Sequence, residues 1–343
     1  MSVRARLVGD GLDHPGNARA LADAASMFGI PVLLRGGRAA AGRHTNGAIS
    51  PLPTVDTATL LGLRPIVAVE NVHGAEPVFT SRLPAGSPTI VVGNERRGIA
   101  SDVLRAALTC VRIPLPSRSI NTLNVAAAAA VALYYLLRGS PAGGTRRGAG
   151  PAQRPAVLLL GPSDHVEAGS ALRSAAAFGW RAVQLDDRFN VWFGTRRSQR
   201  TEARAAARSH RSGLRVHGVR ADEHAGSARI VVATVHADGP PLHRTKLVGG
   251  AGTLVVIPDE QAIDGGTTSS SIFGPGVERA RIDLPAVAGT YRYRLAASIV
   301  LAEISRQLGS RPHRAARRPR YPSAVSTIEA DADLVTPAEL STY

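Results

Sequence analysis

The sequence repeats itself: three segments of its first half recur, in the same order, in its second half. The first is an Ala-rich helical pattern that stops at Phe28 and Gly29, and a similar pattern stops at Phe178 and Gly179, 150 residues later. The second is an apolar strand followed by a turn, which begins at Thr89 and recurs at Thr253. The third is a strand that runs into a long Ala-rich helix, which begins at Val111 and recurs at Ala280. Similar segments in a shared order predict that a whole domain is duplicated.

The length agrees with two domains, because a chain of 343 residues is longer than a domain with one hydrophobic core usually is. In each half, short apolar strands alternate with helical stretches, which predicts an α/β fold with a mostly parallel sheet flanked by helices. We expect domains over residues 1–138 and 155–309. Between them, residues 139–154 form a linker rich in Gly, Pro and Arg, and residues 310–343 read as a disordered tail.

Several classes of protein are excluded by what the sequence lacks. It has no uncharged apolar run of about 18 residues and no signal-peptide core near its start, so we expect a cytoplasmic protein that does not bind membranes. Cys110 is the single cysteine and reads as a small hydrophobe leading into a strand, which rules out an internal disulfide. The ten histidines have no metal-ligand spacing, so no metal is expected.

A formal net charge of +15, carried almost wholly by arginine, indicates a polyanionic partner. Guanidinium groups stay charged and pair bidentately with phosphate. Aromatic residues make up only 4% of the chain, which argues against a surface that reads single-stranded RNA by stacking on exposed rings.

Three motifs of the first half resemble those of a known family. DHPGNARALADAASMFG, VVGNERRGIASDVL and VRIPLPSRSINTLNVAAAAAVALYYL are similar to the ordered motifs of the SpoU/TrmH class of SPOUT RNA methyltransferases. The resemblance implies an α/β sheet whose C-terminal segment is threaded into a trefoil knot, a rare exception among folds. It also implies S-adenosylmethionine as cofactor, a dimer, and methylation of a ribose 2'-hydroxyl in tRNA or rRNA. The chain would then be two tandem SPOUT domains, the second one degenerate.

The resemblance assigns residues to the site of the first domain. Asn17 and Thr122 would orient the substrate, and Glu95 and Asn124 would shape the site. Gly93 and Gly98 are the kind of residue that lets backbone approach a ligand closely or adopt an unusual φ. The implied cofactor-binding residues are Val92, Gly93, Asn94, Gly98, Ile113, Pro114, Leu115 and Leu123.

One position departs from the family pattern. The helical arginine thought to assist deprotonation of the ribose falls on Asp23, and an acid cannot replace that cation. Arg19 lies one helical turn earlier on the same face and is a candidate for a partial, geometrically displaced substitute. We also expect it to contact RNA. The matching position of the second half holds Arg173.

The second half loses other family residues. Glu167 stands in place of the Asn, Ile257 in place of Gly93, and Asp283 in place of Pro114. The residues that replace Thr122, Leu123 and Asn124 are Tyr291, Arg292 and Tyr293. We therefore expect no cofactor there, and an intramolecular pseudo-dimer with one composite site that combines cofactor on the first domain with Arg173 from the second. The alternative is that Arg173 is a surface residue left in a decaying copy.

A second basic feature lies in an insertion of the second half. Arg196, Arg200, Arg204 and Arg208 recur every four residues and would form one stripe on a helix. Such a stripe suits contacts with an RNA backbone, which position a protein without reading sequence. The other interpretation is a solvated helix face.

The sequence thus predicts a monomeric, S-adenosylmethionine-dependent 2'-O-methyltransferase acting on structured RNA. Two alternatives stay open. A catalytically inactive RNA-binding scaffold is one, because the first domain lacks its own arginine; a small-molecule O-methyltransferase is the other.

Overall fold

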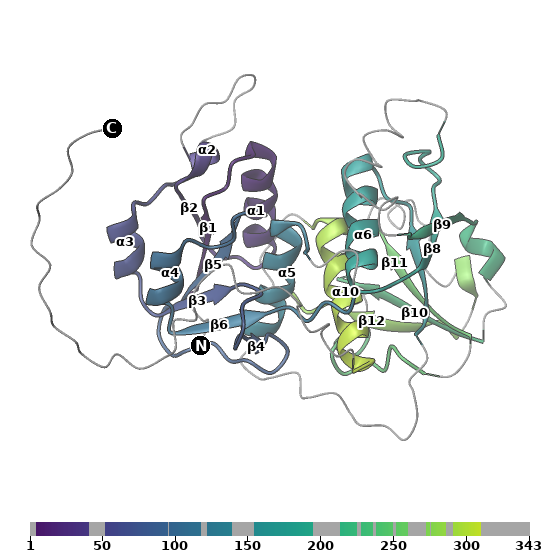
Figure 1. The fold of residues 1–343 in the computed structure, drawn as a ribbon. Helices are drawn as coiled ribbons and strands as arrows, with labels where there is room; N and C mark the ends of the chain where they lie inside the picture. Colours follow the sequence, from purple (N-terminus) through teal and green to yellow (C-terminus); the bar gives the residue numbers. More distant parts are fainter. Residues whose placement is uncertain are drawn as a thin grey trace, which may run out of the picture.

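The computed structural model describes residues 5–40, 52–94, 96–117, 122–138, 154–194, 213–224, 228–235, 238–249, 252–259, 272–274, 276–285 and 291–309. We call residues 5–138 the first unit and residues 154–309 the second unit. Each contains a six-stranded sheet, and every pairing between neighbouring strands is parallel (Figure 1). The predicted α/β class with parallel sheets is confirmed.

The first sheet has the strand order β2-β1-β5-β3-β6-β4. Its strands are β1 (Arg6–Asp10), β2 (Val32–Arg35), β3 (Ile66–Val69), β4 (Glu76–Pro77), β5 (Thr89–Gly93) and β6 (Thr109–Arg112). The helices of this unit are α1 (Pro15–Met27), α2 (Gly37–Ala40), α3 (Thr57–Gly62), α4 (Ser101–Ala106) and α5 (Val125–Leu136).

The second sheet has the order β9-β8-β7-β11-β10-β12. Its strands are β7 (Ala156–Leu160), β8 (Ala182–Asp186), β9 (Arg215–Gly218), β10 (Arg229–Thr234), β11 (Thr253–Pro258) and β12 (Glu278–Arg281). The helices are α6 (His165–Ala177), the 3-10 helix η2 (Ala221–His224) and α10 (Tyr293–Gln307).

Five strands follow the same order in both units. The order β2-β1-β5-β3-β6 of the first sheet corresponds to β8-β7-β11-β10-β12 of the second, and the repeated sequence segments fall on corresponding elements. The sheets differ at their edges, since β4 extends the first beside β6 whereas β9 extends the second beside β8. The predicted helix ends are confirmed: Phe28 and Phe178 cap α1 and α6, and each is followed by a glycine of positive φ.

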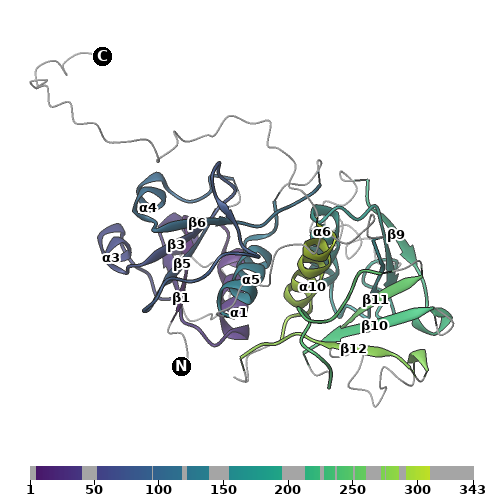
Figure 2. The same ribbon diagram turned by 90° about the horizontal axis from the view of Figure 1, so that it is seen from below.

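Helices cover both faces of the first sheet. Leu60 of α3 and Val103 of α4 pack on one face, against the inward side chains of β1, β3 and β5. Helices α1 and α5 cover the other face (Figure 2). Strand β3 is buried along its whole length, as a central parallel strand requires.

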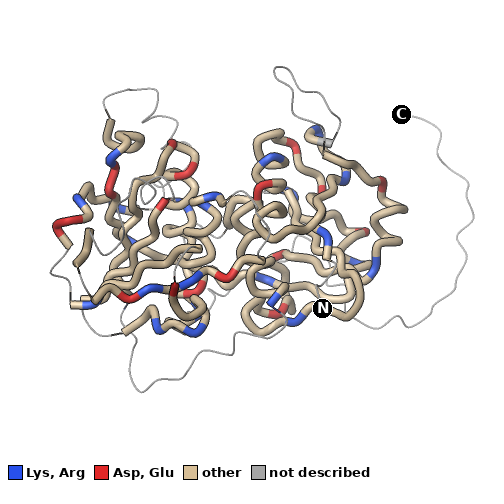
Figure 3. The backbone as a smooth tube through the Cα atoms, turned by 180° about the vertical axis from the view of Figure 1, so that it is seen from behind, with Lys and Arg blue, Asp and Glu red and all other residues tan. Residues whose placement is uncertain are grey.

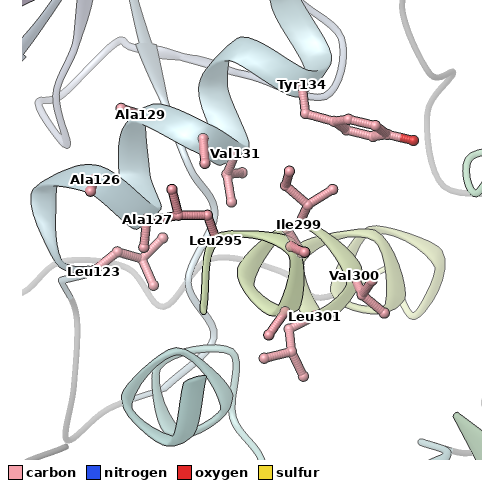
Figure 4. Close-up of a cluster of buried hydrophobic side chains, with 14 of the residues drawn as sticks. Leu123, Ala126, Ala127, Ala129, Val131, Tyr134, Leu295, Ile299, Val300 and Leu301 are labelled. Carbon is pink, nitrogen blue, oxygen red and sulfur yellow. The ribbon is translucent and has the colours of Figure 1, made fainter. Parts of the chain in front are cut away.

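The two units share one hydrophobic core. Helix α5, with the sequence VAAAAAVALYYL, is apolar all round and buried at every position except Ala128; a helix of this kind packs against neighbours on all sides. It lies against α1 of its own unit and α10 of the other, and α10 in turn packs on α6. Figure 4 shows Ala127 and Val131 of α5 beside Leu295 and Ile299 of α10. The units are therefore joined by packed side chains.

Acidic and basic residues are interleaved along both units (Figure 3). One group is buried at the end of β1 and β2, where Arg35 Nη1 lies 2.8 Å from Asp10 Oδ1 and Nη2 lies 2.7 Å from Asp102 Oδ2. Asp10 Oδ2 also accepts a hydrogen bond of 2.7 Å from the Ala100 amide. These contacts fix β1, β2 and the start of α4 at one edge of the sheet.

The described helices include none with the length and apolar character needed to cross a membrane. Among the same described residues, no group of three or more His, Cys, Asp or Glu is arranged to hold a metal ion. Cys110 lies inside β6, half-buried, and burial raises the pKa of its thiol to about 12. The expected linker up to residue 153 and the tail from residue 310 lie outside the described residues.

Candidate functional site

The family-like motifs meet at one edge of the first sheet. Strands β1, β5 and β6 are parallel, so their carboxyl ends and the segments that follow them lie along the same edge, where open α/β sheets bind ligands. The first motif follows β1, the second follows β5, and the third runs from β6 to α5. Glu95, in the second motif, lies outside the described residues.

The second motif forms a tight loop. Gly98 donates from its amide to the Asn94 carbonyl (2.8 Å), and the Asn94 amide donates back to the Gly98 carbonyl (3.2 Å). The Asn94 side chain donates to the Gly11 carbonyl (2.8 Å), which joins this loop to the segment before α1. Gly98 has φ +71° and faces the Glu70 carboxylate. The glycines therefore have a structural reason beyond the one that sequence suggested: the loop's own backbone fills the space beside Gly93, and the Glu70 carboxylate fills the space beside Gly98.

Replacing Gly93 with alanine should destabilise the protein by about 1–3 kcal/mol or more, because the new Cβ would overlap backbone atoms of Gly98 and Ile99. Thermal unfolding would measure the loss. The matched control is Gly62→Ala in α3, where nothing lies within 4 Å of the added carbon, so its melting temperature should not fall. Equal melting temperatures for both variants would contradict the steric explanation.

The first and third motifs touch through two asparagines. Asn124 caps α5 by accepting a hydrogen bond from the Ala126 amide (2.9 Å). Its Nδ2 donates to Asn17 Oδ1 on α1 at 3.4 Å. A side chain that caps one helix and contacts another fixes both helix N-termini relative to each other.

Arg173 reaches the third motif from the other unit. It projects from α6, and its Nη2 donates to Thr122 Oγ1 at 3.3 Å. A second contact lies nearby, because the Ser117 amide donates to the Ala177 carbonyl at the end of α6 (3.3 Å). The structure thus brings Arg173 beside Thr122, two residues before Asn124.

The corresponding contact on the opposite side of the interface is a buried ion-pair network. Asp23 of α1 lies 2.9 Å from Arg294 Nη2 and 3.2 Å from Arg292 Nε. Arg294 also bonds Glu167 of α6, both through its guanidinium and through its backbone amide (2.7 Å). Exposed side-chain fractions of 11% for Arg294, 15% for Asp23 and 6% for Glu167 place these three in the interior, and Arg292, 34% exposed, lies at the edge of the network. Burial raises the pKa of Glu167, and the Arg294 charge partly offsets that effect.

This network explains the departure that the sequence shows at position 23. Two arginines from the start of α10 face that position, and a third would be repelled there. The sequence showed Arg292 only as the loss of a family residue and gave no sign of Arg294. Their partner Asp23 lies about 270 residues away along the chain.

Bulky side chains occupy the matching edge of the second sheet. The Tyr291 hydroxyl donates to the Pro258 carbonyl at the end of β11 (3.1 Å), and Ile257 is fully buried. Tyr293 is buried at the start of α10, and Asp283 pairs with Arg281. Tyr291 therefore covers backbone at the edge where the first unit has glycine.

Of the predicted RNA-binding arginines, the structure describes Arg19. Arg19 is exposed on α1, one turn before Asp23. The stripe of Arg196, Arg200, Arg204 and Arg208 lies outside the described residues.

Comparisons with known proteins identify the class. Residues 4–134 match the model of the SpoU rRNA Methylase family. The first unit is therefore a SpoU-family domain, and the family recognition made from its three motifs is confirmed. A search of the curated proteins found no match to this chain.

Solved structures with similarity to the chain include TrmH/SpoU proteins. The A. aeolicus TrmH/SpoU tRNA modifying enzyme shares 18% identity over 40% of this chain and 75% of its own, with a TM-score of 0.32. A protein from work on the 2-OH methylation of C/U34 on tRNA shares 23% identity over 39% of this chain and 89% of its own, with a TM-score of 0.32. An AdoMet-bound rRNA methyltransferase from Sinorhizobium meliloti shares 21% identity over 40% and 57%, with a TM-score of 0.34.

Proposed function

We propose that the protein is an S-adenosylmethionine-dependent RNA 2'-O-methyltransferase with one composite site, in which the first unit binds the cofactor and the second contributes Arg173. The observation that carries the proposal is the 3.3 Å hydrogen bond from Arg173 to Thr122, across the two units. The contact between Asn124 and Asn17 supports it, because it joins the first and third motifs of the same site. The family match of residues 4–134 supports the reaction class.

The residues of the first unit suit the cofactor chemically. Ile113 and Leu115 are half-buried, so they offer apolar surface for an adenine ring beside main-chain groups of the third motif. Leu123 is buried and would contribute its main chain. Main chain at Val92, Gly93, Asn94 and Gly98 would complete the cradle, with Pro114 between the two apolar residues. When bound, S-adenosylmethionine supplies an electrophilic methyl group on a sulfonium. The second unit suits it poorly, since Tyr291 covers the end of β11.

Arg173 would act on the ribose hydroxyl electrostatically. A hydroxyl is a poor nucleophile because its proton must leave as the new bond to carbon forms. A guanidinium is already protonated and cannot accept that proton, which would pass to solvent water. Its fixed positive charge would stabilise the alkoxide that develops and so ease loss of the proton. Thr122 and Asn17 would hold the ribose beside it, and Asn124 and Glu95 would shape the surrounding loop.

The arrangement of the units supports a built-in dimer. The shared five-strand order is what duplication of one domain would leave, and α5 packs on α10 through apolar residues. We infer that this contact takes the place of the subunit interface of dimeric relatives, so that the protein acts as a monomer. We also infer that the first unit carries the family's trefoil knot. RNA phosphates would lie along Arg19 and the arginines of the insertion.

The experiment is methyl transfer from labelled S-adenosylmethionine to total RNA, followed by mapping of the modified nucleotide. We expect label in RNA, in a linkage that resists alkaline hydrolysis because a methylated 2'-oxygen cannot attack the adjacent phosphate. Calorimetry separates the alternatives. A scaffold would bind no cofactor, whereas a small-molecule methyltransferase would bind cofactor and leave RNA unlabelled; either result would overturn the proposal.

A further inference from the structure

A cleft of about 810 Å³ opens in the second unit, away from the composite site. Its lining residues come from the carboxyl ends of β8 and β9 and the segments that follow them. Figure 1 shows these two strands on the side of the second unit away from α5. The side chains that line it include Arg188, Asn190, Phe193, Arg220, Asp222 and Glu223. Carboxyl ends of parallel strands are where α/β sheets commonly bind ligands. Neither the composite site nor the packing of the two units uses this cleft.

One exposed aromatic ring lines this cleft. The sequence has six phenylalanines, of which four lie in the core: Phe28, Phe79, Phe178 and Phe273. The other two, Phe189 and Phe193, are 44% and 43% exposed, and both lie in the loop after β8. Phe193 lines the cleft, and Phe189 does not. Phe193 therefore combines an exposed ring with a place in a cleft, which suits a ligand that stacks on it, whereas Phe189 is an exposed ring without a cleft.

The loop holds Phe193 in a fixed position. The Asp187 carboxylate accepts hydrogen bonds from the amides of Val191 (2.8 Å), Trp192 (2.9 Å) and Phe193 (2.6 Å). The ring lies on Gly218 of β9, where an added Cβ would be 3.0 Å from Phe193 Cε2. A preordered ring loses little entropy when a flat ligand stacks on it.

The polar groups of the cleft favour a planar ligand that donates hydrogen bonds. Arg220 pairs with Asp222 at 3.1 Å and Arg188 with Asp186 at 3.0 Å, so the cations are already engaged. Both oxygens of Asp222 accept from the Arg220 guanidinium, and Glu223 Oε2 accepts from the Arg220 amide. The two carboxylates are nevertheless exposed at the cleft, and a carboxylate has about four lone-pair sites, so each can accept further hydrogen bonds. More carboxylates than guanidiniums line it, which disfavours a phosphate inside. A carboxylate can accept from the amino and imino groups on the pairing edge of a base, and guanine presents two such donors side by side.

We propose that this cleft binds an unpaired guanine of the RNA, stacked on Phe193 with its pairing edge toward Asp222 and Glu223. The inference rests on the proposed function, because it takes RNA as the substrate. Charge supports RNA over a free nucleotide, because the chain has a formal net charge of +15. The sequence that follows Phe193 of the cleft, between Gly194 and Gly213, lies outside the described residues and carries six arginines and one acid.

The test is the affinity of the full chain for fluorescently labelled UUGUU, UUUUU and the inosine analogue UUIUU, measured by anisotropy without cofactor. We expect UUGUU to bind tightest. Phe193→Ala should weaken that binding on the order of tenfold, as loss of one stacked base does. Phe189→Ala, an equally exposed ring of the same loop, is the matched control and should bind as the unaltered protein does. Glu223→Gln combined with Asp222→Asn should remove the preference for guanine over uracil.

The outcomes separate this inference from the proposed function. Equal binding by Phe193→Ala and the unaltered protein would overturn the guanine site, even if methyl transfer to RNA proceeds. Guanosine monophosphate binding as tightly as UUGUU would overturn it in favour of a free nucleotide. A normal binding pattern in a protein that transfers no methyl group would instead support the site and reject the methyltransferase. Melting temperatures of all variants confirm that each is folded.

Discussion

Arg173→Ala should lower the rate of methyl transfer to RNA by roughly 10²- to 10⁴-fold, the range for losing a group that assists proton transfer or stabilises developing charge. Affinity for S-adenosylmethionine should change little, because the implied cofactor residues lie on the first unit while Arg173 lies on α6 of the second. Single-turnover kinetics with saturating cofactor would measure the rate, and calorimetry would measure the affinity.

Two further substitutions make that result specific. Arg173→Lys keeps the positive charge but removes the planar guanidinium, which can donate two parallel hydrogen bonds, so an intermediate rate is expected. Arg19→Ala removes an exposed arginine of α1, the first unit's own candidate, and should preserve most of the chemical rate while weakening RNA binding. If Arg19→Ala abolished methyl transfer and Arg173→Ala left it unchanged, the composite site would be wrong and the first unit would act alone.

Matching positions on the two sides of the interface between the units carry side chains of opposite charge, Arg173 and Asp23. On one side, a guanidinium of α6 meets a hydroxyl of the third motif. On the other, Asp23 meets two guanidiniums from the start of α10, and the space is filled by ion pairs. A homodimer cannot make such a division, because its two interfaces are identical by symmetry. A fused chain is free to keep one site and turn its twin into a structural contact.

Sequence reasoning succeeded where the signal was local. The Phe-Gly helix ends, the alternation of strands and helices and the three motifs all lie within short segments, and they gave the fold class and the family. It failed for Asp23, which read only as a missing cation, because its partners Arg292 and Arg294 come from the far end of the chain. No spacing rule connects residues so far apart.

Composition could not locate the aromatic rings. A content of 4% aromatics argued against stacking surfaces, yet an average says nothing about where the rings lie. Phe189 and Phe193 are four residues apart and both exposed, whereas the remaining phenylalanines are buried. The pattern DDRFNVWFG contains both rings, but their exposure follows from the turn that Asp187 organises and is not visible in the letters.

Arg294→Met should reduce the free energy of unfolding by about 3–5 kcal/mol at pH 8, the cost of removing one partner from a buried ion pair. The substitution keeps most of the side-chain volume, but it leaves Glu167 without its cation and Asp23 with Arg292 alone. The matched control is Arg281→Met, which removes an arginine from a more exposed pair with Asp283 and should cost at most about 1 kcal/mol. Denaturant unfolding of both variants and the unaltered protein gives the comparison.

The pH dependence tests whether charge causes that loss. Burial raises the pKa of Glu167 in the folded protein, and removing the guanidinium raises it further. A carboxyl whose folded pKa lies above its unfolded value stabilises the protein below the unfolded pKa and loses that contribution as pH rises through the folded pKa. The deficit of Arg294→Met should therefore shrink as pH falls from 8 toward 5, because Glu167 then takes up a proton. A deficit that stays constant over this range would mean that lost packing, and not an uncompensated carboxylate, weakens the variant.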